Sequence, residues 1–419
     1  MKVRFELRGS KLVVQFECQH GEPKREQPKM AGDSFYVQLD SPETYPSIHP
    51  DHLALIALLV VRPWLGSSIV FDRGISRSMA AAFAENNITA QPVDEHLTPY
   101  SATGGGFHGL AYSGGADSTA ALSVMPPTTV PVFLDRPKTE KSLYAKEAAL
   151  LSCEKLRKIG YHSLVIDCNL EQMREPIGFP TDLANGVPAI AMAVKLNLCG
   201  ISYGTVFESL YGIGRIRFKE YESTSHKKMW WSLFESAGLP ISFPVGGVSE
   251  VGTELICSKS PFNSLARSCI RGTLASPCNN CWKCFRKSTL KQALSLQDFN
   301  IKEHHHLLNS REVKRKLSAL PISHENVLLY SFSKLDMSNY PGEFETRFSY
   351  LSDVDFLERW YAPSLSYVHN TLKDHVGSQL QSYLQTMDEE DHQSVENWDI
   401  GQQIDTLDAL VYEVNDADP

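Results

Sequence analysis

Long apolar runs are missing from this chain of 419 residues. The longest run covers residues 53–61, whereas a membrane-spanning helix needs about 20 apolar residues. Residues 1–10 lack the apolar stretch that a secretory signal peptide requires. Disorder of the whole chain is excluded as well, because 42% of the residues are apolar and only 21% are charged. We therefore expect a folded, cytoplasmic protein that does not cross a membrane.

Lys and Arg are absent from the C-terminal segment 388–419, which contains eleven Asp and Glu. The formal net charge of the chain is -9, but the rest of the chain carries 38 acidic and 40 basic residues. A nearly neutral body argues against a nucleic-acid binder. The segment from Asp388 onward is predicted to be a solvated acidic tail that contacts a basic partner or keeps the protein soluble.

A disulfide framework is also unsupported, because nine cysteines are an odd number and the chain is long. Five cysteines are scattered and are expected to be buried apolar residues: Cys18, Cys153, Cys168, Cys199 and Cys257. The other four follow the spacing C-x8-C-x2-C-x2-C: Cys269, Cys278, Cys281 and Cys284. Four thiolates suit tetrahedral Zn²⁺, so we predict a structural zinc site with every position filled. A redox or sulfur-carrying role is the alternative.

Basic residues directly follow or interrupt the cysteine cluster. Lys283, Arg286 and Lys287 lie close to the cysteines in sequence. Four thiolates on one Zn²⁺ leave a net negative charge. We expect these three cations to offset it.

Patterns of strands and helices divide the chain into three predicted regions. Residues 1–105 form an α+β accessory region that starts with a hairpin of strands 2–8 and 11–18. Residues 106–290 alternate short apolar strands with helices, which is typical of βαβ units and a parallel sheet covered on both faces. Residues 291–419 are predicted to be mostly helical, with the acidic tail at their end. The strands expected in the middle region are 107–112, 130–134, 163–168 and 200–204, with helices ending near 121, at 141–158 and at 188–198.

The first strand of the middle region leads into a glycine-rich turn, Tyr112-Ser-Gly-Gly-Ala-Asp-Ser-Thr119. This segment is predicted to form a strand, then a tight turn, then the first turn of a helix. Backbone N–H groups in such an arrangement point to one place, which favours an anion site. The two glycines let the backbone approach a phosphate closely, and Ser113 and Ser118 can add hydroxyl groups. Asp117 would repel a bare phosphate, so its presence predicts a Mg²⁺ ion between them.

Two other phosphate motifs are excluded. No Walker sequence occurs in the chain. Gly104, Gly106 and Gly109 match G-x-G-x-x-G, but they precede the strand instead of following it, so we discard a dinucleotide site.

The run Ser113-Gly-Gly-Ala-Asp-Ser118 resembles the S-G-G-x-D-S loop of the N-type ATP pyrophosphatases, the adenine nucleotide alpha-hydrolase superfamily. The resemblance implies a parallel, doubly wound sheet of that type. It implies that ATP and Mg²⁺ bind at this loop, and that ATP is cleaved between its α- and β-phosphates to give an adenylated intermediate. The implied nucleotide-binding residues are Ser113, Gly114, Gly115, Asp117, Ser118 and Thr119, with Phe133 and Leu134 beside the adenine.

Catalysis of such an adenylation is expected to need positioning and charge stabilisation. We predict Ser113, Asp117 and Ser118 as catalytic residues at the loop. A cation is expected on the far side of the phosphates, with Lys259 chosen as catalytic from the candidates Arg136, Lys138 and Lys259.

The loop and the cysteine cluster together resemble the 7-cyano-7-deazaguanine synthase family across residues 107–290, including Ser268-Cys269 and Cys284-Phe285-Arg286. The implied reaction adenylates the carboxylate of 7-carboxy-7-deazaguanine. Ammonia then displaces AMP, and a second ATP dehydrates the amide to a nitrile. The substrate run of that family, Ser-Gly-Tyr-Pro-Asp-Cys, is absent after the fourth strand. In its place we predict that Glu208 accepts hydrogen bonds from a guanine-like base and that Tyr211 stacks on it.

Long additions on both sides of this core resemble the synthase-like proteins of bacterial antiphage defence operons, including type IV CBASS. That resemblance implies transfer of a deazaguanine acyl group to a protein amine, with defence-operon proteins as partners and a homodimer left open. Two alternatives remain: an ATP-binding scaffold or regulator of a defence complex, and a tRNA-thiolating pyrophosphatase. The thiolating enzyme would need a cysteine pair near the loop, but the nearest cysteine after it, Cys153, stands alone.

Overall fold

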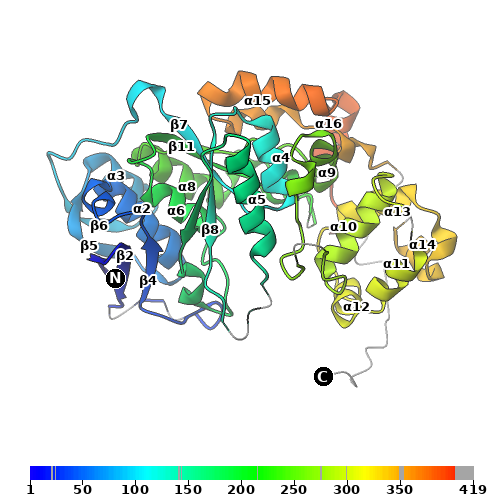
Figure 1. Ribbon diagram of the computed structural model, residues 1–419, viewed down its shortest axis with the longest axis horizontal. Helices are drawn as coiled ribbons and strands as arrows, with labels where there is room; N and C mark the ends of the chain where they lie inside the picture. The colour runs from blue at the N-terminus through cyan, green and yellow to red at the C-terminus, as the bar shows by residue number, and fades with distance from the viewer. Residues whose placement is uncertain are drawn as a thin grey trace.

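The computed structural model describes residues 1–19, 22–23, 25–139, 142, 144–214, 216–273, 276–298, 300–348 and 353–401. A mixed α/β body fills the left and centre of Figure 1, and most of the helices that follow it lie to the right. No helix in the described part of the chain is long and apolar enough to cross a membrane.

The N-terminal region is built around a five-stranded sheet of order β4-β2-β1-β5-β6. Its first two strands form the predicted antiparallel hairpin, with Gly9 in the left-handed region at φ 62°. The last two strands join in parallel and were not predicted from the sequence. The strands are β1 Lys2–Arg8, β2 Lys11–Glu17, β4 Ser34–Gln38, β5 Ser68–Ile75 and β6 Thr89–Val93, and the helices are α2 Pro50–Val61 and α3 Arg77–Glu85.

The second five-stranded sheet has the order β12-β11-β7-β8-β9, and all its strand pairs are parallel. The chain enters at the centre on β7, winds outward through β8 and β9, and then crosses back to β11 and β12. In open sheets of this kind, ligands bind beyond the carboxyl ends of the strands where the winding reverses, here between β7 and β11. The strands are β7 Phe107–Ala111, β8 Val130–Asp135, β9 Leu164–Asp167, β11 Leu198–Tyr203 and β12 Ile241–Ser242.

Helices cover both faces of this sheet, as predicted. Leu110 and Phe133 belong to an apolar cluster with α4 (Ala116–Val124) and α5 (Glu147–Lys158), whereas Ala111 and Leu134 belong to a second cluster with α6 and α8. Neighbouring residues of a strand point to opposite faces, which explains the near-continuous apolar sequence of β7 and β8. Two helices, α6 (Val187–Ala191) and α8 (Ser225–Ser236), lie on the second face.

The two sheets share one apolar core. A single buried cluster runs from the N-terminal strands through α2 and α6 to the central strands. Val37 of β4 bridges to Cys168, directly after β9, and the Tyr36 hydroxyl donates to Asp167 Oδ2 over 2.9 Å. The N-terminal region is therefore packed into the body of the molecule.

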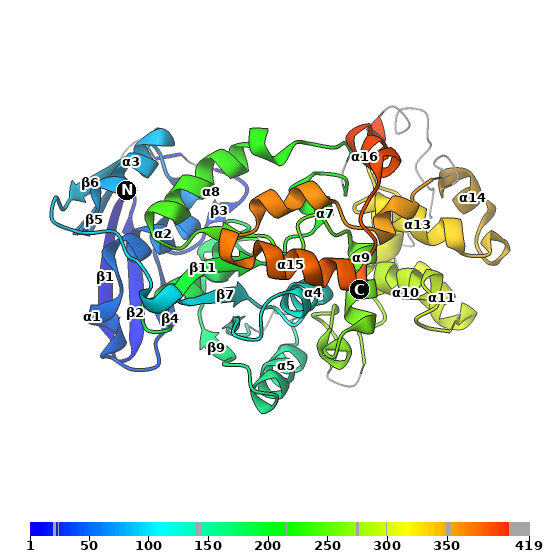
Figure 2. The same cartoon turned by 90° about the horizontal axis from the view of Figure 1, so that it is seen from above.

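The C-terminal part is mostly helical, as predicted. Its α15 lies across α4 and α9 in Figure 2. The helices are α9 Glu250–Lys259, α10 Trp282–Ala293, α11 Ile301–Leu308, α12 Arg311–Leu317, α13 Glu325–Lys334, α14 Gly342–Phe348, α15 Asn370–Tyr383 and α16 Glu389–Glu396.

The prediction of a solvated tail from Asp388 onward was wrong for its first residues. Asp388 caps α16, and Arg359 forms an ion pair with Asp391 over 2.5 Å. Trp398 and Ile400 are buried. These contacts explain how an acidic segment folds: one cation and two apolar side chains fix it to the body. The remaining tail residues, 402–419, lie outside the described part of the chain.

Candidate functional site

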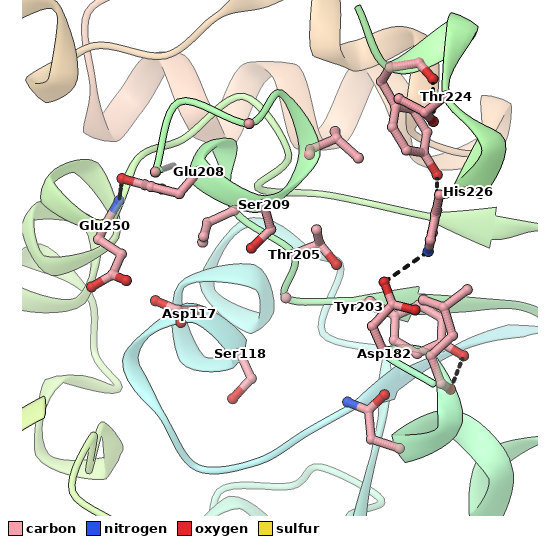
Figure 3. A pocket seen from close by; sticks show the side chains of 18 of the residues that line it. Asp117, Ser118, Asp182, Tyr203, Thr205, Glu208, Ser209, Thr224, His226 and Glu250 are labelled. Carbon is pink, nitrogen blue, oxygen red and sulfur yellow. Dashed lines mark hydrogen bonds and ion pairs between the residues drawn. The ribbon is translucent and has the colours of Figure 1, made fainter. Parts of the chain in front are cut away.

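A cavity of about 800 Å³ opens at the carboxyl ends of β7 and β11. Ser113, Asp117 and Ser118 line it from the turn after β7, and Gly204 and Thr205 line it from the turn after β11. Figure 3 shows Asp117 and Ser118 at the start of α4, below the segment that carries Glu208. The cavity therefore lies at the reversal point of the sheet, where ligands of such folds bind, and its size is ordinary for a small-molecule site.

The glycine-rich turn has the geometry that its sequence predicts. Gly114 adopts φ 73°, in the left-handed region that favours glycine. The hydroxyl groups of Ser113 and Ser118 lie 3.0 Å apart, and Ser118 Oγ donates to the Gly115 carbonyl over 3.2 Å. No side chain caps the start of α4. The first amides of this helix are thus available for an anion.

Gly204 permits the close approach that forms the back of the cavity. A Cβ atom at this position would lie 2.8 Å from both the backbone N and the Cα of Ser118. Any side chain would therefore force the end of β11 away from the start of α4. Glycine at this position keeps the two sides of the reversal point in contact.

Helix α9 supplies a hydrogen-bond partner to Asp117. Ser249 caps α9 by accepting from Val251 N and Gly252 N over 3.1 and 3.0 Å. One turn into the helix, Thr253 Oγ1 donates to Asp117 Oδ1 over 3.2 Å. The Asp117 carboxylate is therefore held in place beside the cavity by a neighbouring helix.

A buried group of charged residues lies behind this position. Arg286 and Lys287 of α10 contact the Glu250 carboxylate over 3.0 and 3.3 Å, and Lys287 Nζ also reaches Glu254 over 3.1 Å. His324 Nδ1 lies 2.8 Å from Glu250. Glu250, Glu254, Arg286 and Lys287 are all nearly inaccessible to solvent. Buried charges need partners of this kind because desolvation is costly.

Interactions within this group of buried residues shift the pKa values of Glu250 and Lys287 in opposite directions. Burial alone would raise the pKa of Glu250, but Lys287 and Arg286 lower it well below its usual range. Burial alone would lower the pKa of Lys287, but Glu254, Glu250 and Asp117 raise it above its usual value. The charged form of Lys287 is therefore favoured, and its charge interacts with Asp117 as well as with its own ion-pair partners.

Lys287→Met should reduce the free energy of unfolding by about 3–5 kcal/mol, because two buried carboxylates lose a partner. Lys291→Met is the matched control. Lys291 lies one turn later on α10, is 41% exposed and contacts the same Glu254 at 3.8 Å. Because Lys291 is exposed, its interaction with Glu254 is weakened by solvent and should contribute only about 0–1 kcal/mol. Urea denaturation of both variants tests this difference, and equal losses would contradict it.

Glu208 is a buried carboxyl group with one oxygen unpaired. Its side chain lines the cavity, and the residue is only 3% exposed. Oε1 accepts from Glu250 N and Asn326 Nδ2, both over 2.9 Å. Oε2 has no hydrogen-bond partner among the described residues. Burial, followed by the negative charge of Glu250, raises the pKa of Glu208 to about 7. An unpaired, buried acceptor in a cavity wall is a strong indication of a ligand contact.

The raised pKa predicts a pH dependence of stability. Between about pH 4.5 and 7, folded Glu208 keeps its proton while the unfolded chain has lost it, so stability falls as the pH rises. The slope is at most about 1.4 kcal/mol per pH unit. Glu208→Gln should remove this contribution, whereas Glu235→Gln, on the exposed face of α8, should keep it. Unfolding free energies from pH 4.5 to 7.5 test this, and parallel wild-type and Glu208→Gln curves would contradict it.

The other end of the cavity carries a histidine held on both sides. His226 Nε2 lies 2.9 Å from Asp182 Oδ2, and the Tyr221 hydroxyl lies 2.8 Å from His226 Nδ1. Burial alone would raise the pKa of Asp182, but hydrogen bonding to His226 lowers it. Figure 3 shows Asp182 and His226 across the cavity from Asp117. The cavity thus has a carboxylate, Asp117, at one end and a histidine paired with a carboxylate, His226 with Asp182, at the other.

The structure brings together Ser113, Asp117, Ser118 and Glu208 of the predicted residues, with Gly114 and Gly115 in the turn between them. Thr119 lies one position deeper and is buried, with its hydroxyl 3.3 Å from that of Tyr112.

Three predicted ligand contacts lie in the protein core. Phe133 and Leu134 are 3% and 5% exposed, on opposite faces of the sheet, and neither lines the cavity. Tyr211 is buried, with Phe207, Phe218 and Tyr361 packed around its ring. It lies next to cavity residues in sequence, but its ring is covered by aromatic neighbours. The ring of Tyr211 therefore stacks on protein side chains, and not on the guanine-like base that was predicted to stack on it.

The three predicted far-side cations have other partners. Lys259 Nζ donates to the Tyr383 carbonyl over 2.8 Å at the far end of α9, so the geometry gives no support to a catalytic role. Arg136 pairs with Glu171 over 2.7 Å, and Lys138 pairs with Glu147 over 2.9 Å. None of the three lines the cavity. Lys287 of α10, which the sequence did not place beside the turn, interacts electrostatically with Asp117 instead.

The four predicted cysteine ligands gather in one place. Their Sγ atoms all lie within 4.8 Å of one another. Cys284 Sγ is 3.7 Å from Cys278 Sγ and 3.5 Å from Cys281 Sγ. Zn–S bonds of about 2.3 Å in a tetrahedron place sulfur atoms about 3.8 Å apart. This cluster can therefore hold a metal ion such as zinc.

Two neighbours of the cysteines differ from their predicted role. Arg286 and Lys287 point into the buried carboxylates and do not offset the thiolates. Arg271 interacts electrostatically with the cluster, because its pKa is raised by a hydrogen bond to Glu312 and by the charges of Cys281 and Cys278.

The cysteine loop begins against the glycine-rich turn. Arg267 N donates to the Gly114 carbonyl over 2.7 Å, two residues before Cys269. Ser152 Oγ of α5 donates to the Leu265 carbonyl over 2.9 Å. The cluster, the turn and α5 are thereby joined.

Comparison with known proteins yields one family. Residues 229–399 match a family of unknown function, DUF6395. The match covers less than half of the chain and includes α9, the cysteine loop, α10 and α16, but not the glycine-rich turn. No curated protein and no solved structure matches the chain. The matched family carries no assigned activity, so functional inference depends on the site itself.

Proposed function

We propose that this protein is an ATP-dependent enzyme that adenylates a 7-deazaguanine carboxylate and transfers the acyl group to an amine. The proposal places it in the 7-cyano-7-deazaguanine synthase-like group of the adenine nucleotide alpha-hydrolase superfamily. The observation that carries it is the cavity at the reversal point, where Ser113, Asp117 and Ser118 meet a glycine turn and an uncapped helix start. The parallel sheet wound to both sides of β7 supports the proposed fold type.

The turn residues fit a nucleotide and its metal ion. Gly114 and Gly115 would bring backbone amides to the phosphates, with hydroxyl groups from Ser113 and Ser118. Asp117, fixed by Thr253, is an oxygen ligand of the type that Mg²⁺ prefers. Bound Mg²⁺ would supply charge neutralisation at the phosphates. Lys287, which interacts electrostatically with Asp117, replaces Lys259 as the proposed cation behind the site.

The cysteine cluster fits a structural zinc ion in this proposal. Cys281 precedes α10 and Cys284 lies in its first turn, so a bound ion would fix the start of the helix that carries Arg286 and Lys287. All four positions are filled by protein sulfurs, which leaves none for substrate. The metal would therefore organise the site without taking part in the chemistry.

Glu208 is the proposed recognition residue for the base. Its unpaired Oε2 could accept from the N1–H or 2-amino group of a guanine-like ring. The carboxylate would face the phosphates at the turn of Ser113 and Ser118, where its oxygen displaces pyrophosphate from ATP. The opposite polar end, with His226 held between Asp182 and Tyr221, would receive the incoming amine. A carboxylate reacts with an amine only after its oxygen becomes a good leaving group. AMP is that leaving group once the adenylate has formed.

The proposal is tested by incubating the protein with ATP, Mg²⁺ and 7-carboxy-7-deazaguanine. We expect AMP and pyrophosphate in equal amounts. 7-Deazaguanine, which lacks the carboxylate, is the control and should release neither. Release of ADP and phosphate, or equal AMP release with the control compound, would overturn the proposal.

The amine acceptor is tested separately. With ammonia, mass spectrometry should show the amide and then the nitrile. With a protein partner from a defence operon, it should show a mass increase on that partner equal to the deazaguanine acyl group. ATP binding without turnover under all these conditions would favour the scaffold alternative.

A further inference from the structure

The wall of the cavity between β7 and β11 contains more acids than bases. Four carboxyl groups line it, all drawn in Figure 3: Asp117, Asp182, Glu208 and Glu250. Among the described residues of the wall, Lys219 is the only lysine or arginine. Lys287 interacts electrostatically with Asp117 but does not line the cavity, and two buried carboxylates share its charge. Lys219 is therefore the lysine in this wall that a negatively charged ligand could contact directly.

The backbone that carries Lys219 is held on two sides. Its N–H group donates to the Tyr211 carbonyl over 2.8 Å, which closes the loop that follows α7 (Phe207–Leu210). One residue earlier, Phe218 N donates to the Trp398 carbonyl, also over 2.8 Å. The rings of Phe218 and Tyr211 are stacked, with their centroids 5.6 Å apart. These contacts fix the position of Lys219 beside the cavity.

The side chain of Lys219 is packed along its stem and unpaired at its charged end. A Cβ atom on Gly212 would lie 3.6 Å from Cγ and 3.7 Å from Cδ of Lys219, so the stem runs over this glycine. The ammonium group has no hydrogen-bond or ion-pair partner in the described part of the chain. The neighbouring acid, Glu220, accepts from the Tyr367 hydroxyl over 3.3 Å instead. A packed stem and an available charge suit a lysine to anion binding.

We propose that Lys219 is a ligand-binding residue of this cavity and contacts an oxyanion of the bound ligand. The oxyanion is either a phosphate of ATP or the carboxylate that is to be adenylated, so the inference rests on the proposed function. Both groups accept charge-assisted hydrogen bonds from an ammonium group. Carboxylates in the wall repel such an anion, and the charge of Lys219 offsets this repulsion.

The test is equilibrium titration of the full-length, zinc-loaded protein with two probes in the presence of Mg²⁺. The probes are α,β-methylene-ATP, which cannot be cleaved between its α- and β-phosphates, and 7-carboxy-7-deazaguanine. The variant Lys219→Met keeps an apolar stem over Gly212 and removes the charge. It should weaken the binding of one probe about tenfold or more, because a hydrogen bond to a charged group is lost. The weakened probe identifies the oxyanion.

Two kinds of control separate the charge of Lys219 from other effects. Lys228→Met removes an exposed lysine of α8 that does not line the cavity. It should change both affinities less than about threefold, because solvent screens such a charge. Adenosine and 7-deazaguanine lack the oxyanions, so Lys219→Met should bind them as the wild-type protein does. Weaker binding of these two compounds would show a disturbed loop and would overturn the proposal.

Three further outcomes would overturn it. Unchanged affinity of Lys219→Met for both probes would remove Lys219 from the site and leave the proposed function intact. Equal weakening in Lys228→Met would show general charge attraction. Failure of the wild-type protein to bind either probe would overturn the proposed function as well. Binding of α,β-methylene-ATP that depends on Lys219, without AMP release from ATP, would support the role of Lys219 and overturn adenylation alone.

Discussion

Cys284→Ser should remove the bound metal and unfold the helices that follow the cysteine loop. Cys284 lies in the first turn of α10, and α10 packs against α11, α12 and α13. Structural zinc contributes about 10–16 kcal/mol of apparent binding free energy in small domains at pH 7. We therefore expect the zinc content to fall from one per chain to nearly zero, with a large loss in the free energy of unfolding. Metal analysis and urea denaturation measure both quantities.

Cys199→Ser is the matched control for this experiment. Cys199 is a partly buried cysteine of β11 outside the cluster. Its replacement should leave the zinc content at one per chain. Wild-type protein that contains no metal after preparation with zinc would refute the four-thiolate site. Full zinc retention in Cys284→Ser would show that Cys284 is not a ligand.

Asp117→Asn should lower AMP release on the order of a hundredfold or more, because the amide cannot neutralise a magnesium ion. The shape of the side chain is preserved, and the amide oxygen can still accept from Thr253 Oγ1, so the fold should remain intact. The measurement is the initial rate of AMP and pyrophosphate release at saturating ATP and substrate.

Glu147→Gln provides the comparison for Asp117→Asn. Glu147 is also an acid in the first turn of a helix on this sheet, but it is exposed, pairs with Lys138 and lies outside the cavity. Its replacement should change the rate less than twofold. Unchanged turnover in Asp117→Asn would remove this residue from the mechanism, and an equal loss in Glu147→Gln would point to a general effect of charge.

Local patterns accounted for the features that the sequence predicted well. The hairpin and the turn from β7 into α4 each depend on alternation or glycines within a few residues. The cysteine cluster depends on spacing within one loop. Strand β5 was missed because its apolar run is only three residues long and is followed by Asp72, Arg73 and Gly74, and β6 was missed because it contains Pro92.

Long-range packing decided the features that were missed. Lys287 reaches the site only because the cysteine loop turns α10 against α9, and no pattern near Asp117 indicates this. One signal was present: Glu250 and Glu254 are four residues apart, as are Lys287 and Lys291. Such spacing puts each pair on one helix face and could have suggested that the two helices pair through their charges. Tyr211 was taken for a ligand contact because the sequence does not show the rings that enclose it.

The shared core of the two sheets has a consequence for protease digestion. Most residues of the segment 94–106 between the sheets are exposed, so a protease should cut it readily. The two fragments should nevertheless elute together from a size-exclusion column under native conditions, because the Val37–Cys168 bridge, the Tyr36–Asp167 bond and one apolar cluster span the cut. They should separate only in denaturant.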